Sequence, residues 1–210
     1  MPTPADLSQF RYNAKAGRYI APNGRFVTQK ALIADLERVT AGAQSEILTI
    51  SRQLQAGEIS LAQWQLGMRD QMKILHTTQG SIAKGGWAQM SQSDWGAVGQ
   101  ISREQYAFLQ RFAIQIEQGL PLNGAFLRRA QMYAQAGRGT YWQMKRREAS
   151  ANGLAQERRV RYAGDSCQTC IDQAALGWQP VGTLRKIGDS ECRTNCRCEF
   201  EFGNEQPTEA

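Results

Sequence analysis

The chain has 210 residues, 41% of them hydrophobic and 21% charged, and a formal net charge of +6. This length allows one sizeable core or a main domain with a small appendage, and the composition excludes disorder throughout. The apolar runs are too short to span a membrane, and the first residues lack the basic start and apolar stretch of a secretory signal. We therefore expect a protein made in a reducing cytoplasm, where stable disulfides are not the default.

The first 27 residues carry two short β-prone pieces, 18–20 and 25–27. They flank Pro22-Asn23-Gly24, and Asn-Gly is a strong signal for a tight turn. We predict a small hairpin or an extended arm over 1–27.

Helical patterning dominates from 28 to 152. Apolar residues recur at spacings of three and four over 29–55, which predicts one amphipathic helix. Capping boxes at Ser60 and Ser102 predict the starts of two more helices. A long polar helix follows over about 125–150, with a break near Gly137 and Gly139. Because each apolar stripe must be covered, we expect a helical bundle.

After Gly153 the pattern changes to alternation. The stretches "ERRVRYAG" (157–164) and "RCEFEF" (197–202) each read as a short strand. We predict a compact α+β subdomain over 153–203 and a flexible tail over 204–210. The expected fold class is therefore mainly α, an N-terminal helical bundle with a small C-terminal α+β subdomain stapled by a Cys-rich site. A subdomain with so few apolar residues usually needs such a staple.

All five cysteines lie in this subdomain, in the pattern C-x2-C-x21-C-x3-C-x-C: Cys167, Cys170, Cys192, Cys196 and Cys198. Two close-spaced groups separated by about twenty residues are how a chain builds a tetrahedral thiolate site for zinc. Cys167, Cys170 and Cys192 are the surest ligands, and Cys196 is favoured over Cys198 as the fourth. Four thiolates would close the site and make the zinc structural. A disulfide-linked knot and unligated thiols are the alternatives.

Basic residues are concentrated in one stretch. Between 128 and 161 there are nine Lys and Arg residues against Glu148 and Glu157. Such a strip indicates contact with nucleic acid or an acidic protein surface, and a solvated helix face is the alternative. The candidate contact residues are Arg146, Arg147, Arg158, Arg159 and Arg161.

The sequence contains no pattern that favours an enzymatic function. His76 is the single histidine, and paired carboxylates, a phosphate-binding glycine loop and a nucleophile elbow are not recognisable. We interpret His76 as a structural or exposed residue, so we expect a non-catalytic protein.

The order of features near the C-terminus resembles the phage head morphogenesis family, the Mu-F-like minor head proteins. The matching pieces lie within residues 125–202: "TYWQMKRREASANGLAQERRVRYAG", "DSCQTC", "ALGWQPVGTLRKIG" and "ECRTNCRCEF". The most specific element is the Cys-Arg-Cys ending together with a Cys-x-x-Cys pair at this distance upstream. Where the family has a histidine before this ending, the chain has Cys192, with one extra residue before Cys196.

This resemblance implies a minor structural protein of the virion, acting in head assembly at the portal vertex. Portal or capsid proteins would be its partners, oligomers would be compatible with this role, and packaged DNA would be contacted without sequence specificity. It implies location in the virion head, and in the host cytoplasm during assembly. The alternative function is a zinc-ribbon protein that binds nucleic acid nonspecifically.

Overall fold

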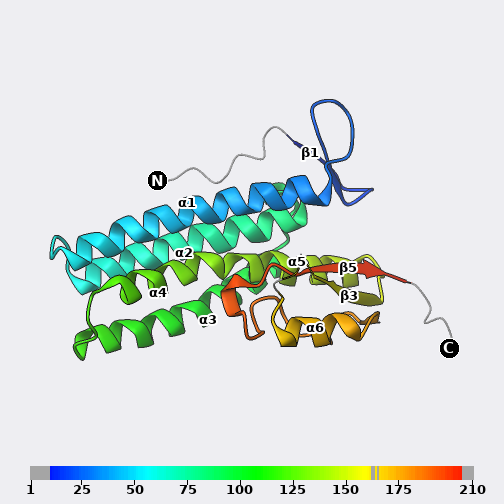
Figure 1. Ribbon diagram of the computed structural model, residues 1–210. Helices are drawn as coiled ribbons and strands as arrows, with labels where there is room; N and C mark the ends of the chain where they lie inside the picture. Colours follow the sequence, from blue (N-terminus) through cyan, green and yellow to red (C-terminus); the bar gives the residue numbers. More distant parts are fainter. Residues whose placement is uncertain (1–9, 162–163, 165, 205–210) are drawn as a thin grey trace. The chain divides into compact units, whose positions relative to one another are not determined.

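The computed structural model describes residues 10–161, 164 and 166–204, and within them the chain is mainly helical with a small C-terminal strand region (Figure 1). The expected fold class is thus confirmed. The chain divides into two compact units, and the division falls between Gly137 and Arg138. Within the described part, no helix is both long and apolar enough to cross a membrane.

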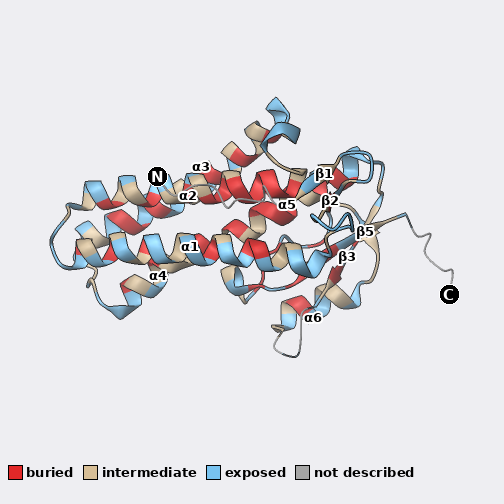
Figure 2. Cartoon of the chain, turned by 90° about the horizontal axis from the view of Figure 1, so that it is seen from above, coloured by how far each residue is buried: buried red, intermediate tan, exposed pale blue. Residues whose placement is uncertain are grey.

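Four long helices build the N-terminal unit. Helix α1 packs beside α2 and α4, and α2 also packs beside α3. The elements, in chain order, are β1 (Arg11–Asn13), β2 (Arg18–Ile20), α1 (Gln29–Gln55), α2 (Leu61–Lys84), the 3-10 turn η1 (Trp87–Gln89), α3 (Gln92–Glu117) and α4 (Gly124–Gln135). Buried and exposed residues alternate along α1, as the apolar spacing predicted (Figure 2).

The N-terminal hairpin differs from the predicted one. Strand β2 coincides with the predicted piece 18–20, but its antiparallel partner is β1, with Tyr12 opposite Tyr19. The piece 25–27 forms only an isolated bridge, between Ile20 and Phe26. The predicted arm also included 1–9, which lie outside the described residues.

The helix starts follow side-chain capping. Ser60 and Gln63 form the predicted capping box of α2. The capping box predicted at Ser102 is wrong, because α3 begins earlier with a box made by Ser91 and Asp94. Ser102 lies inside α3, where its hydroxyl donates to the Val98 carbonyl at 2.9 Å. Asp94, at the third helical position, accepts a hydrogen bond from the backbone N–H of Ser91. In the usual capping box, which guided the prediction, Glu or Gln has this role.

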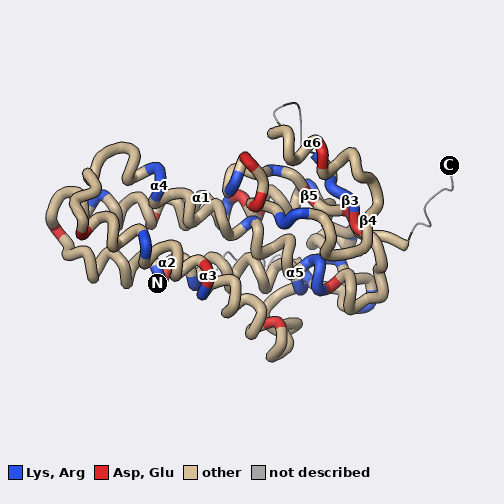
Figure 3. Tube along the Cα trace, turned by 90° about the horizontal axis from the view of Figure 1, so that it is seen from below, with Lys and Arg blue, Asp and Glu red and all other residues tan. Residues whose placement is uncertain are grey.

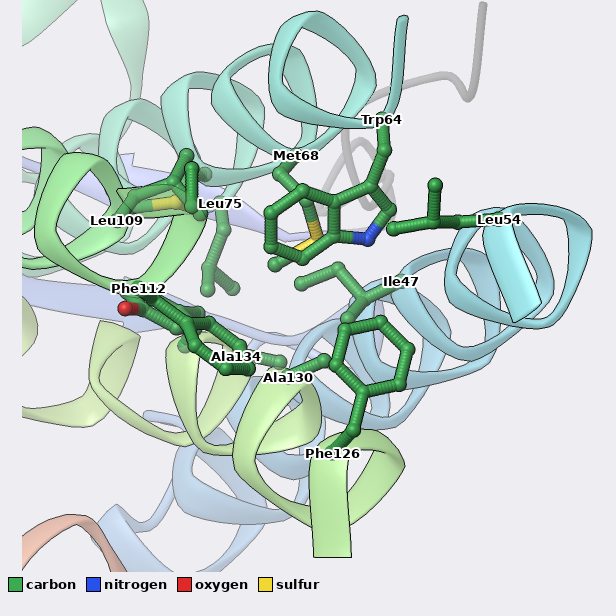
Figure 4. Packing of buried hydrophobic residues seen from close by; sticks show 13 residues of the cluster. Ile47, Leu54, Trp64, Met68, Leu75, Leu109, Phe112, Phe126, Ala130 and Ala134 are labelled. Carbon is green, nitrogen blue, oxygen red and sulfur yellow. The ribbon is translucent and has the colours of Figure 1, made fainter. Parts of the chain in front are cut away.

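An aromatic cluster forms the centre of the N-terminal unit (Figure 4). The rings of Trp64, Phe112 and Phe126 lie 5.6 to 5.8 Å apart in mutual contact. The indole of Trp64 also donates to the Ser51 hydroxyl at 3.0 Å, so its buried polar atom is satisfied. These contacts tie α1, α2, α3 and α4 to one core.

The C-terminal unit is a three-stranded antiparallel sheet with two helices. Its elements are α5 (Gly137–Ala151), β3 (Gln156–Val160), α6 (Gln168–Ala175), β4 (Gln179–Pro180), the 3-10 turn η2 (Arg193–Asn195) and β5 (Glu199–Gly203). The strand order is β4-β3-β5, and the register places Arg159 opposite Phe200. The two predicted strands thus pair with each other.

The unit boundary falls after the first residue of α5, whereas the sequence placed 28–152 in one helical domain and began the Cys-rich subdomain at 153. The predicted break near Gly137 is present, since α4 ends at Gln135 and α5 begins at Gly137. Helix α5 contacts the sheet: the Trp142 ring meets Phe200 at 6.0 Å, and Arg146 bonds Glu157. Helical periodicity identifies α5 as a helix but carries no information on which neighbour covers it.

Candidate metal centre

Two segments of the C-terminal unit carry the five cysteines. Cys167 is the residue that precedes α6, and Cys170 lies in the first turn of that helix. Cys192 and Cys196 flank η2, and Cys198 leads into β5. The two groups of cysteines therefore lie at the two ends of the chain segment that joins the start of α6 to the turn η2.

The sulfur atoms gather around Cys170. Its Sγ lies 3.7 Å from the Sγ of Cys192 and 3.7 Å from that of Cys196. Within 4.8 Å of one another lie the sulfurs of Cys167, Cys170 and Cys192, and likewise those of Cys170, Cys196 and Cys198. Two sulfurs bound tetrahedrally to one zinc ion, each about 2.3 Å from it, lie about 3.8 Å apart. The Cys170 distances thus match the spacing of a thiolate metal site.

All five cysteines are free thiols rather than disulfides, and Cys170, Cys196 and Cys198 are buried. The first group of sulfurs is the set that spacing identified as the surest ligands, and both Cys196 and Cys198 join Cys170 in the second. The cluster can therefore hold a metal ion.

Hydrogen bonds favour the thiolate form of Cys196. A hydrogen bond from the Cys198 thiol lowers the pKa of Cys196 well below its ordinary value, and backbone N–H groups of Cys198 and Gly188 add to this against the effect of burial. The same bond, together with burial, raises the pKa of Cys198. Burial raises the pKa of Cys192. Cys196 and Cys198 thus have opposite tendencies to ionise.

Two of the five predicted contact arginines lie inside the unit. Arg146 forms a two-pronged pair with Glu157, at 2.7 Å from both Nε and Nη2, and also donates to the Leu184 carbonyl at 2.7 Å. Arg159 is buried and donates to sulfur atoms of the cluster. The expectation that Arg146 and Arg159 meet an external partner is therefore corrected, because both are committed to internal acceptors.

The other three predicted contact arginines are exposed: Arg147, Arg158 and Arg161. Arg158 bonds Glu201 at 2.6 Å, and its guanidinium lies 4.9 Å from the Trp178 ring centre. Figure 3 shows Lys and Arg positions along α5 and β3. Residues along β3 alternate in direction, so the basic strip that is continuous in sequence is divided between the interior and the surface.

Sequence reasoning missed Glu157 as a site-supporting residue. Its side chain is 0% exposed and accepts hydrogen bonds from Arg146 and from the Leu184 backbone N–H. The available signal was its place in an alternating strand two residues from Arg159, which puts both on one face. Two charged residues on an inward face do not produce a hydrophobic pattern, so periodicity did not reveal that Glu157 is buried.

No protein-family model, curated protein or solved structure matches the chain.

Proposed function

We propose that the protein is a non-catalytic minor structural protein of a tailed-phage virion, acting in head morphogenesis near the portal, with a zinc-stapled C-terminal unit. The observation that carries the proposal is the convergence of Cys-x-x-Cys and Cys-Arg-Cys in one cluster. These are the motifs on which the resemblance to the Mu-F-like minor head proteins rests.

Zinc fits the donor set. Thiolates are soft ligands that select zinc over harder divalent cations, and a site closed by four of them has no open position for a substrate. Zinc there would link α6 to the η2 segment and supply folding free energy. The C-terminal unit needs this additional stabilisation, because Ile171 and Leu176 of α6 are exposed and do not contribute to a core.

The partners proposed are portal or capsid proteins, with nonspecific contact to packaged DNA through Arg147, Arg158 and Arg161. These side chains are exposed, and contacts from Arg to phosphate need no sequence code. The proposed location is the head interior or portal vertex of the virion, and the host cytoplasm during assembly.

The test is quantitative mass spectrometry of particles made by the genome that encodes the chain. We expect the protein in purified procapsids and virions at few copies, retained after washing at about 1 M salt, where the Debye length falls to about 3 Å. Its absence from both kinds of particle would refute the structural role.

The second candidate function is nonspecific nucleic-acid binding by a zinc-ribbon-like unit, and the exposure of the same three arginines is what favours it. The full chain would then bind double-stranded DNA with an affinity that falls steeply with salt. Replacing Arg161 by Gln would lower the slope of log affinity against log salt by about 1. Binding to DNA without incorporation into particles would favour this function over the first.

A further inference from the structure

Arg159 is a buried cation with no carboxylate beside it. Its side chain projects inward from β3, and the residue is 3% exposed. Among the described residues, no Asp or Glu forms an ion pair with it. Its neighbour in the same unit, Arg146, is neutralised by Glu157, so Arg159 stands out as the buried guanidinium that lacks an ordinary anion.

Sulfur atoms occupy the place where an anion would be expected. Nη1 of Arg159 lies 3.8 Å from the Sγ of Cys170 and 3.8 Å from the Sγ of Cys196. Nη2 donates to the backbone carbonyl of Arg185, and the guanidinium lies 5.0 Å from the Phe200 ring centre. One prong of the guanidinium is thus shared between two cysteines.

A buried cation of this kind is costly unless a negative charge is near. The penalty for burying an ion amounts to several kcal/mol, and an opposite charge with good hydrogen bonds offsets it. Neutral thiols are weak acceptors and carry no charge, whereas metal-bound thiolates carry it permanently. The converse also holds, because four thiolates on one Zn²⁺ leave a net charge of about −2 that a guanidinium reduces.

We infer that Arg159 is the charge-compensating partner of a metal bound by Cys167, Cys170, Cys192 and Cys196, and that Cys198 is an unligated fifth thiol. The inference rests on the proposed zinc site and deepens it. Arg159 touches no metal itself, so it is a positioning residue that acts through the sulfurs of Cys170 and Cys196.

Cys196 and Cys198 differ in what their sulfurs accept. The Sγ of Cys196 accepts a hydrogen bond from Nη1 of Arg159, the kind of outer contact that stabilises a ligating sulfur. Within the described chain, the hydrogen bonds of Arg159 to sulfur go to Cys170 and Cys196 and not to Cys198. The surroundings therefore assign the fourth position to Cys196, which the spacing of the two residues left open.

The ligand set is tested with a matched pair of full-length variants, Cys196→Ser and Cys198→Ser. We expect Cys198→Ser to keep one zinc per chain and, after loading with Co²⁺, the thiolate-to-cobalt absorption of the parent. Cys196→Ser should lose about a quarter of that absorption intensity, as one of four thiolates is removed. Loss of metal or absorption in Cys198→Ser, or equal loss in both variants, would overturn the assignment.

The role of Arg159 is tested with Arg159→Gln, with Arg159→Lys as the conservative variant and Arg158→Gln as the control on the exposed face of the same strand. Zinc affinity is measured by competition with a chromophoric chelator. Changing an outer partner of a metal ligand lowers affinity by about 10- to 100-fold. We expect this range for Arg159→Gln, partial recovery with Arg159→Lys, and parental affinity for Arg158→Gln.

The outcomes separate the inference from the proposal beneath it. If the parent chain, purified without chelator, carries no zinc and takes up no Co²⁺, the proposed zinc site fails. If the parent binds zinc and Arg159→Gln binds it equally well, the compensation by Arg159 is refuted while the site stands. Arg159→Lys retains the charge and provides the second measurement if Arg159→Gln does not fold. A loss of zinc affinity in Arg159→Lys of about 100-fold or more would show that charge does not carry the role.

Discussion

The buried ion pair between α5 and β3 offers a prediction whose size follows from the structure. Glu157 is 0% exposed and receives three hydrogen bonds, two from Arg146 at 2.7 Å and one from the Leu184 backbone at 3.1 Å. Burial lowers the pKa of Arg146, and the charge of Glu157 opposes that shift. The change Glu157→Gln keeps the shape but leaves the guanidinium buried without its counter-charge. Breaking a buried pair in this way costs about 3–5 kcal/mol.

The same sheet provides a matched control. Arg158 and Glu201 form an ion pair across β3 and β5 with both side chains nearly half exposed, and an exposed pair is worth about 0–1 kcal/mol. We expect Glu201→Gln to change stability by no more than that. The double change Glu157→Gln with Arg146→Met should recover part of the loss, because it removes the stranded charge.

The assay is hydrogen exchange followed by mass spectrometry, read on peptides from 138–161 and 166–204. It gives the free energy of opening of the C-terminal unit separately from that of the N-terminal unit, which a single denaturation curve of a two-unit chain does not. The reasoning is refuted if Glu157→Gln lowers the opening free energy by no more than Glu201→Gln does.

Three further predictions concern the metal, the buried histidine and the core. With zinc in the cluster as proposed, removing the metal with a chelator, or replacing Cys170 by Ser, should unfold the Cys-rich part of the C-terminal unit and leave most helical circular dichroism intact. Uniform loss of helix would contradict the separate units. Burial lowers the pKa of His76 from 6.5 to about 4, so the folded state binds its proton less readily than the unfolded chain. Stability of the N-terminal unit should fall by about 3 kcal/mol as pH drops from 6.5 to 4, and His76→Gln should lack that part of the pH dependence when hydrogen exchange is read on peptides of this unit. Phe112→Ala should cost about 3–5 kcal/mol in the same measurement, because Phe112 is fully buried among three aromatic rings; a loss below about 1 kcal/mol would contradict the packing.

Local pattern was a reliable guide where the deciding interactions are local. The helix over 29–55 and the capping box at Ser60 follow from spacings of three and four residues, and both are present. The box predicted at Ser102 failed because Ser91 and Asp94 start the helix eleven residues earlier. Once a helix has begun, the hydroxyl of a serine within it donates back to a backbone carbonyl and does not start a new helix.

The cysteine cluster was predictable for a related reason. Close spacing within Cys167–Cys170 and within Cys192–Cys198 restricts each group to one place, and metal ligation demands that both groups meet. Spacing did not separate Cys196 from Cys198, since alternate residues of an extended segment point the same way. What distinguishes them is the guanidinium of Arg159 on β3, far away in sequence, which donates to the sulfur of Cys196.

The sequence by itself therefore determined the class of fold, the long first helix and the residues from which a metal site can be made, because each depends on neighbours within a few positions. Only the tertiary structure decided that α5 belongs with the sheet, that Glu157 and Arg159 face inward, and that Arg158 between them faces solvent. A run of charged residues looks the same whether water or a buried counter-charge satisfies it. The choice between them is made by groups that folding brings together: Arg146 for Glu157, and two cysteine sulfurs for Arg159.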